Sequence, residues 1–187
     1  MPDATLETFL NTGAYLRGHF RLTSGLHSAE YLQSAKVLQY PNIAEKLAQE
    51  LAACMPKGDA VASPALGGLV IGHEVARAMG VRFIFTERDA EGKMTLRRGF
   101  AVTPGERFIV IEDVVTTGGS TREVIDLLLS MGASVLSAGS IVDRSGGKAD
   151  VGVPRVALTT LQPETWPPDF CPLCKDGVPV EKPGSRK

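Results

Sequence analysis

The residues with the clearest chemical potential lie in one stretch, Arg107 to Glu123, with the sequence RFIVIEDVVTTGGSTRE. Two carboxylates, Glu112 and Asp113, directly follow the apolar run from 108 to 111. A loop of small residues, 116 to 121, comes next, and an apolar helical pattern follows it. Carboxylates accept hydrogen bonds from hydroxyl groups, whereas a small-residue loop before a helix offers backbone N–H groups to an anion. The stretch therefore combines acceptors for hydroxyls with a site for an anion.

A ligand for both halves must carry a phosphate at one end and hydroxyls a few ångströms away, because a phosphate beside both acids would be repelled. A ribose 5-phosphate fits, with its phosphate in the loop and its 2- and 3-hydroxyls donating to Glu112 and Asp113. Two common phosphate motifs are absent: no Lys follows the glycines as in GxxxxGK[ST], and there is no GxGxxG. An ordinary strand, Gly-containing turn and helix is the simpler alternative, which the full combination of acids, TTGGST and helix disfavours.

The segment IVIEDVVTTGGST resembles the phosphoribosyl-pyrophosphate (PRPP) motif of the type I phosphoribosyltransferases. The resemblance implies that PRPP is the cosubstrate, and it leaves the base open. Mg²⁺ is then expected on the pyrophosphate and the ribose hydroxyls of the substrate, since this hard cation prefers substrate phosphates to an all-protein cage. The acids and the loop after them would bind PRPP: Glu112, Asp113, Val114, Val115, Thr116, Thr117, Gly118, Gly119 and Ser120.

The elements that position this motif alternate along the chain, which predicts an α/β fold with a central, mainly parallel sheet flanked by helices. Ser120 and Glu123 have the spacing of a capping box, so Ser120 is the expected N-cap of its helix. Ligands of such sheets bind at the carboxyl ends of the strands, so the loops after 63, 86, 111 and 142 should converge. Strands are expected at 59–63, 81–86, 107–111, 133–142 and 155–161, and helices at 3–16 (ended by Gly18), 41–55, 69–79 (ended by Gly80) and 120–130.

The stretch LTSGLHSAEYLQSAKVL, residues 22–38, resembles the hood segment of orotate phosphoribosyltransferases, with its S-G-x-x-S core. Further matches in PALGG, ERDAEGKMTLRRGF and VDR extend the resemblance over most of the chain. It implies a glycosyltransferase, more closely a pentosyltransferase, that converts orotate and PRPP into orotidine 5′-phosphate and pyrophosphate in UMP biosynthesis. It also implies that Thr116 and Arg144 contact orotate, whose carboxylate suits an Arg fork.

The same resemblance divides the chain into an N-terminal helix and hood (1–40), an α/β PRPP-binding core (41–162) and an irregular tail (163–187). Such enzymes act as homodimers in which the lid of one subunit covers the active site of the other, so a homodimer is expected. Orotate phosphoribosyltransferases often carry a Lys where this chain has Thr23 and another where it has Gly67. Lys36, Arg88 or the lid are the candidates to compensate.

The polar stretch after 86, ERDAEGKMTLRRG, has two interpretations. It is either a solvated hairpin of mixed charge or a mobile lid whose cations meet the departing pyrophosphate, and the lid is favoured for the stretch as a whole. A cation brought in by closure stabilises the charge that the leaving group gains in the transition state. Arg88 and Lys93 are the PRPP-binding candidates here, and Lys93 stands in for the histidine that many such lids contain. Lys93, Glu112 and Asp113 are the predicted catalytic residues.

The composition is that of an ordinary globular protein. Of 187 residues, 43% are hydrophobic and 22% charged, and the net charge of −1 argues against a nucleic-acid or membrane surface. The N-terminal sequence MPDATLETFL lacks the basic segment and apolar core of a signal peptide. Three cysteines, an odd number, suit a reducing compartment, so a cytoplasmic protein is expected.

Cys171 and Cys174 form the CxxC sequence CPLC. Two thiols in a surface turn of the tail are the favoured interpretation, because a zinc site needs two more ligands and no histidine is near in sequence. The alternative is a zinc site completed by His19, His27, His73 or a partner chain. A substrate role is also open for His27, and Cys54 is expected in the core.

Two other functions remain open at this point. A purine or uracil phosphoribosyltransferase would carry the same PRPP motif. A non-catalytic PRPP-sensing regulator would usually add a DNA-binding segment, and neither a helix-turn-helix pattern nor a basic patch precedes the motif.

Overall fold

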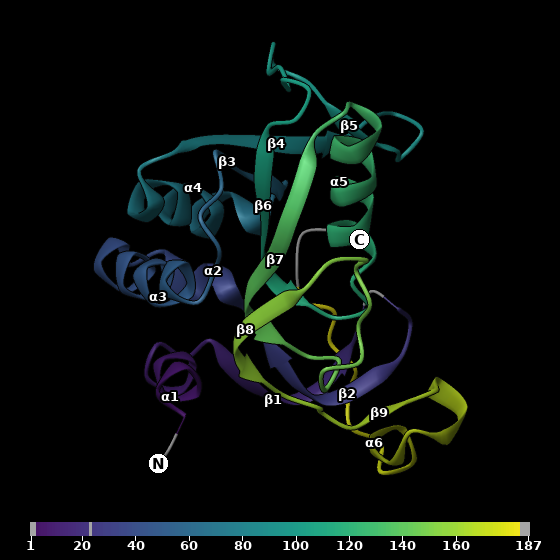
Figure 1. The fold of residues 1–187 in the computed structure, drawn as a ribbon. Helices are drawn as coiled ribbons and strands as arrows, with labels where there is room; N and C mark the ends of the chain where they lie inside the picture. Colours follow the sequence, from purple (N-terminus) through teal and green to yellow (C-terminus); the bar gives the residue numbers. More distant parts are fainter. Residues whose placement is uncertain (1–2, 23, 184–187) are drawn as a thin grey trace. The chain divides into compact units, whose positions relative to one another are not determined.

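The computed structural model describes residues 3–22 and 24–183 (Figure 1). The chain forms two compact units: one contains the residues up to Val37 and from Gln162 onward, and the other contains Leu38–Leu161. Thr23, the position at which a lysine is expected in the family, lies outside the described residues. None of the helices in the described part of the chain is both long and apolar enough to cross a bilayer.

The unit formed by 38–161 is an α/β sheet, as predicted. Its six strands have the order β5-β4-β3-β6-β7-β8, parallel except for the antiparallel pair β4–β5. In Figure 1, α3 and α4 lie on one side of the sheet and α5 on the other. The elements are α3 (Pro41–Ala53), β3 (Ala60–Pro64), α4 (Gly68–Met79), β4 (Arg82–Arg88), β5 (Met94–Leu96), β6 (Arg107–Val115), α5 (Gly119–Ser130), β7 (Ser134–Asp143) and β8 (Arg155–Thr160).

Strand β6 is the centre of this sheet. Phe108, Ile109, Val110 and Ile111 are completely buried, because helices cover both faces of the sheet and these four side chains meet apolar neighbours. The strand also extends beyond its expected end at 111, since its ladder with β7 continues as far as the pair of Val115 and Asp143. The two acids, Glu112 and Asp113, therefore lie in the C-terminal part of the strand and not in the loop after it.

The order of the strands places a switch point between β3 and β6. Strand β3 is followed along the chain by its neighbour on one side, β4, whereas β6 is followed by its neighbour on the other side, β7. The loops that leave β3 and β6 consequently turn in opposite directions and open a crevice at the carboxyl ends of these two strands. The fold thus predicts a ligand site at this crevice.

The predicted capping box at the start of α5 is wrong. Gly118 is the N-cap, with a φ of 82°, and no side chain caps the helix. Ser120 is the second residue of the helix, and Glu123 pairs with Arg88 instead of reaching back to the helix start. The predicted C-terminal end of α4 is confirmed: Gly80 ends this helix in the left-handed conformation (φ 69°).

The other unit contains a three-stranded antiparallel sheet. Its first helix is shorter than predicted: it ends at Asn11 because Gly13 turns the chain with a φ of 63°, and Gly18, the expected stop, lies in the following strand. The tail, expected to be mostly irregular, contains short regular elements. This unit comprises α1 (Ala4–Asn11), β1 (Tyr15–Arg21), β2 (His27–Leu32), β9 (Thr165–Trp166), η1 (Pro168–Phe170) and α6 (Pro172–Lys175), and α2 (Ser34–Leu38) joins it to the other unit.

Two predictions about cysteines are also wrong. Cys54 is exposed, since it follows the last residue of α3 as the C-cap and its side chain leaves the apolar face of the helix. Cys171 is completely buried, so it is not part of a surface turn.

Candidate active site

The acids of β6 meet the loop that follows β3. A Cβ atom at Gly67 would lie 2.6 Å from Asp113 Oδ1, and one at Gly68 would lie 3.3 Å from Glu112 Oε1. The missing side chain at position 67 therefore leaves room for the Asp113 carboxylate, in the place where a lysine is expected in the family. The structure brings the predicted acids and the PALGG loop together at the crevice between β3 and β6.

Glu112 lies in a different environment from Asp113. The side chain of Glu112 is buried, with 8% exposure, whereas Asp113 is half-buried and its backbone N–H lies 3.2 Å from Glu112 Oε1. Burial raises the pKa of Glu112 well above its ordinary value, and the neighbouring charge and hydrogen bond of Asp113 raise the pKa further. A buried acid with a perturbed pKa at a crevice is typical of a functional site, because burial of a carboxyl group lowers stability.

The loop after β6 has the form of an anion site. Thr116, Thr117, Gly119 and Ser120 are exposed, and the first amides of the 12-residue helix α5 have no carbonyl partner within the helix. Gly118 is buried, and a Cβ atom on it would lie 2.9 Å from Val151 Cγ1. The turn thus requires glycine both for its positive φ and for its close approach to a neighbour.

Arg144 begins the loop after β7. Its backbone N–H donates to Val115 O (2.7 Å), which places the two residues predicted to contact orotate, Thr116 and Arg144, on adjacent loops. The preceding residue, Asp143, is buried and stabilises the loop after β7, because it accepts hydrogen bonds from Ser145 (2.7 Å) and Arg155 (3.0 Å). Burial raises the pKa of Asp143, but these hydrogen bonds outweigh it and lower the pKa below its ordinary value.

The stretch after β4 forms a β-hairpin with β5. Arg88 in this hairpin reaches the first turn of α5, with Nη1 2.7 Å from Glu123 Oε2 and Nη2 3.5 Å from Ser120 Oγ. Lys93 lies on the exposed turn of the hairpin, and within the described residues no hydrogen bond or ion pair joins it to the acids of β6. The segment therefore has the mixed-charge hairpin form, and its role as a lid stays a prediction.

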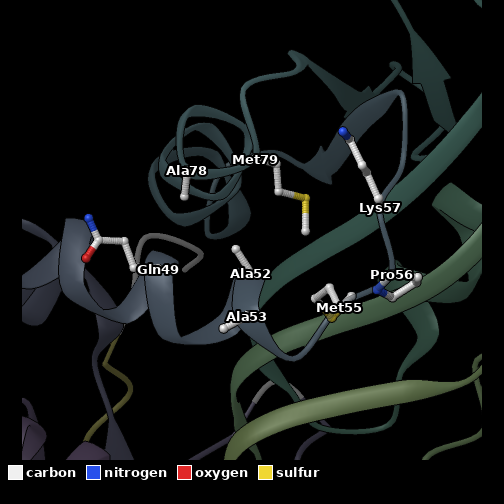
Figure 2. Close-up of a pocket in the computed structure, with 8 residues that line it drawn as sticks. All are labelled: Gln49, Ala52, Ala53, Met55, Pro56, Lys57, Ala78 and Met79. Atoms are coloured by element: carbon white, nitrogen blue, oxygen red, sulfur yellow. The ribbon is translucent and has the colours of Figure 1, made fainter.

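A depression of about 390 Å³ lies between the C-terminal ends of α3 and α4 (Figure 2). Because both helices end where the next strand begins, the depression is at the opposite edge of the sheet from the acids of β6. Its lining contains no acid and is mainly small and apolar: Gln49, Ala52, Ala53, Met55, Pro56, Lys57, Ala78 and Met79. It is separate from the candidate active site.

An acid pair beside an exposed turn at a helix start, at the switch point of a parallel sheet, is the arrangement that the motif of a phosphoribosyltransferase predicts. The phosphoribosyl transferase domain family matches residues 33–168 of the chain. The orotate phosphoribosyltransferase of Heliobacterium modesticaldum is 54% identical over 98% of both chains, and that of Desulforamulus reducens is 53% identical over 99% of this chain and 97% of its own.

Comparison with solved structures points to the same family. Orotate phosphoribosyltransferase from Aeropyrum pernix superimposes with a TM-score of 0.71 and 29% identity over 83% of this chain and 93% of its own. Leishmania donovani UMP synthase gives a TM-score of 0.72 with 28% identity, over 84% of this chain and 36% of that longer protein. The chain belongs to the orotate phosphoribosyltransferase family.

Proposed function

We propose that this enzyme transfers the ribose 5-phosphate of PRPP to orotate, giving orotidine 5′-phosphate and pyrophosphate as a step of pyrimidine biosynthesis. The observation that supports this most strongly is the pair Glu112 and Asp113 at the crevice between β3 and β6, next to an exposed anion-binding turn. Membership of the orotate phosphoribosyltransferase family supports orotate as the base, in preference to a purine or uracil.

The acids would act on the sugar. Departure of pyrophosphate builds positive charge on the anomeric carbon, and a carboxylate fixed beneath the ribose stabilises that charge without reorganising. Asp113 is the more accessible of the two acids and is suited to this role. Glu112, whose burial favours its protonated form, is suited to orienting a ribose hydroxyl.

Three parts of the site would bind the anionic groups of the two substrates, PRPP and orotate. The backbone amides of Thr117 to Ser120 bind the 5-phosphate at the start of α5. The guanidinium of Arg144 pairs with the orotate carboxylate, and Thr116 supplies a hydroxyl to the ring. Arg88 exchanges its present partner, Glu123, for the pyrophosphate, joined by Lys93 from the turn of the hairpin.

Mg²⁺ is part of the proposal because the donor set suits it. The pyrophosphate and the ribose hydroxyls of PRPP would supply its oxygen ligands, and the carboxylate of Asp113 beside the ribose suits a hard cation held on those hydroxyls. When bound, Mg²⁺ neutralises charge on the pyrophosphate. The protein itself contributes the fixed acids and the amides that orient the sugar.

We also propose that the enzyme is a cytoplasmic homodimer in which each subunit lends the exposed turn of its β4–β5 hairpin, with Lys93, to the site of the other. The exposed turn that carries Lys93 supports this arrangement, since its ammonium group has no described contact with the acids of β6 in its own chain. The free thiols of Cys54, Cys171 and Cys174 are in keeping with a reducing compartment.

A spectrophotometric assay tests the proposed reaction. Purified protein with PRPP and Mg²⁺ should deplete the absorbance of orotate, and pyrophosphate should appear at the same rate. Hypoxanthine and uracil in place of orotate should give no product. Turnover of hypoxanthine or uracil, with orotate left unchanged, would show that orotate is not the base this enzyme uses. No turnover with any of the three bases would favour a PRPP-sensing protein.

A further inference from the structure

Four metal-ligating side chains meet in the unit that contains the two ends of the chain: His19, His27, Cys171 and Cys174. Their ligand atoms all lie within 4.8 Å of one another. His19 Nε2 is 2.8 Å from His27 Nδ1 and 3.4 Å from Cys171 Sγ, and Cys174 Sγ is 3.3 Å from His27 Nδ1. About 150 residues separate the histidines from the cysteines in the sequence, so this cluster is built by the tertiary fold.

The histidines come from the hairpin of β1 and β2, in which an irregularity directs them to one place. The register of the two strands shifts between Arg17 and Phe20, so β1 has one more residue than its partner in this stretch. His19 and Phe20 are therefore both buried, although alternation along a regular strand would expose one of them. The bulge turns His19 toward the same buried space as His27.

The cysteines flank the short helical turn α6. Cys171 is its N-cap and is completely buried, and Cys174 lies three residues on, which directs both thiols to one side. The C-x₂-C spacing on a tight turn is typical of half of a structural zinc site. Both thiols are free, with no disulfide between them.

The hydrogen bonding of His19 prepares it to bind a metal. Its Nδ1 lies 2.7 Å from Val178 O, a carbonyl that can only accept, so Nδ1 carries the proton. In the neutral ring Nε2 then has a lone pair, and Nε2 is the atom that points at Cys171, Cys174 and His27. Donation of the second ring nitrogen to a backbone carbonyl is the usual arrangement for a metal-binding histidine.

We propose that His19, His27, Cys171 and Cys174 bind one structural zinc ion. Zn–N and Zn–S bonds in a tetrahedron place the ligand atoms roughly 3.3 to 3.8 Å apart. The measured separations of 3.3, 3.4 and 3.7 Å match this range, and the 2.8 Å between the two nitrogens needs only a small widening. Four protein ligands leave no open position, so the site is structural and separate from the transferase chemistry.

Two other occupants fit the geometry less well. A two-iron cluster would hold the cysteines on one iron and the histidines on the other. Here Cys174 Sγ lies within 3.7 Å of both histidine nitrogens, which suits a single ion. A magnesium ion is disfavoured because thiolate and imidazole are poor ligands for a hard cation.

The zinc ion would fasten the tail of the chain to the N-terminal hairpin. Beyond α6 the tail runs back along β1, where the Glu181 N–H donates to His19 O (2.8 Å) and the Arg21 N–H donates to Glu181 O (2.8 Å). The segment between is short and largely exposed, with little apolar burial to hold it. A metal crosslink between residues far apart in sequence supplies the stability that such a segment lacks.

The first test is the metal content of the wild-type protein, purified without chelators and dialysed. We expect about one zinc per chain and no stoichiometric iron. Less than about a tenth of this amount, together with no uptake when Zn²⁺ is added to reduced protein, would overturn the proposal. Stoichiometric iron without zinc, or a Cys171–Cys174 disulfide in freshly purified metal-free protein, would also overturn it.

Replacement of the proposed zinc ion by Co²⁺ shows which kinds of atom bind the metal in the wild-type protein, so that no variant is needed. The proposal predicts the intense visible bands of a tetrahedral ion and the near-ultraviolet bands of cobalt–thiolate bonds, which Zn²⁺ should displace. The weak spectrum of an octahedral ion bound only by oxygen and nitrogen would contradict it.

Variants then assign the ligands. Cys174→Ser should weaken zinc binding by at least about 100-fold. Cys54→Ser and His73→Gln are the matched controls, since both residues are exposed and lie outside the cluster, and both should keep one zinc per chain. Unchanged zinc affinity in Cys174→Ser would exclude this site, and if that variant fails to fold, the cobalt spectrum of the wild type decides.

Discussion

At Glu112 a carboxyl group is almost completely removed from water, and a second acid, Asp113, follows it in the strand. Burial of an acid disfavours its ionised form and lowers stability at neutral pH. Among the described residues no cation offsets this effect, since burial and the neighbouring Asp113 are the causes that raise the pKa of Glu112. The position therefore makes sense as part of a binding site whose ligand brings hydroxyls and positive charge.

Glu112→Gln should stabilise the ligand-free protein above the ordinary pKa of 4.5. The folded pKa of Glu112 is raised, so its contribution to stability is fully present below the unfolded pKa and is lost as pH rises toward the folded pKa, by at most about 1.4 kcal/mol per pH unit. Urea unfolding between pH 5 and 8 should show this loss in the wild type and in the exposed control Glu50→Gln, but not in Glu112→Gln. Equal slopes in all three proteins would contradict the raised pKa.

Asp113→Asn should lower kcat by at least about tenfold, because the amide keeps the size of the side chain and removes the charge that, in the proposed mechanism, faces the anomeric carbon. The melting temperature should stay close to that of the wild type, since Asp113 is only half-buried. Asp126→Asn on the exposed face of α5 is the control and should leave kcat unchanged. An unchanged kcat in Asp113→Asn would refute the role assigned to this acid.

Arg144→Lys should raise the KM for orotate about 10- to 100-fold, which corresponds to loss of one charged hydrogen bond of the guanidinium fork. The KM for PRPP should change little. Arg77→Lys, on the exposed surface of α4, is the control. A parallel rise of both KM values would indicate that Arg144 supports the fold of the loop and does not bind orotate.

At the scale of elements, the sequence predicted the parallel sheet and most of its strands, because buried strands such as Phe108–Ile111 are continuous apolar runs. It did not predict the true end of β6, which depends on the ladder with β7. Ser120 failed as an N-cap since the preceding turn places Gly118 at the helix start. Both errors have the same cause: a local pattern cannot report how neighbouring elements position the chain.

The turn between β6 and α5 depends on Gly118. Gly118→Ala should lower the free energy of unfolding by about 1 to 2 kcal/mol from the left-handed backbone alone, and the contact of its Cβ with Val151 should add to this loss. Gly119→Ala is the matched control for stability, since its Cβ would have no neighbour closer than 3.6 Å. Urea unfolding measures both, and equal stability of the two variants would contradict the strained turn.

For the molecule as a whole, the sequence motif placed the proposed catalytic acids and the proposed anion-binding loop in one contiguous stretch. The convergence of His19 and His27 with the two cysteines was only the less favoured alternative in the sequence, because it depends on a β-bulge and on a tail that returns to the first strand. The signals were present separately, as a CxxC and a pair of histidines in a hairpin. Only the fold joins them.

The proposed dimer predicts a particle of twice 19.9 kDa in light scattering. If the turn of the hairpin completes the site of the partner, mixing equal amounts of the impaired Lys93→Ala and Asp113→Asn subunits should restore about a quarter of wild-type activity, because half of the dimers would contain one intact site. Each variant alone is the control. A monomer, or a mixture no more active than the sum of its parts, would contradict the shared hairpin.

A crystal structure of the enzyme with orotidine 5′-phosphate tests the assigned active site most directly. We expect the phosphate on the amides of 117–120, the ribose hydroxyls on Glu112 and Asp113, and the base carboxylate on Arg144. Density for the nucleotide at any other place, or acids of β6 turned away from the ribose, would contradict it.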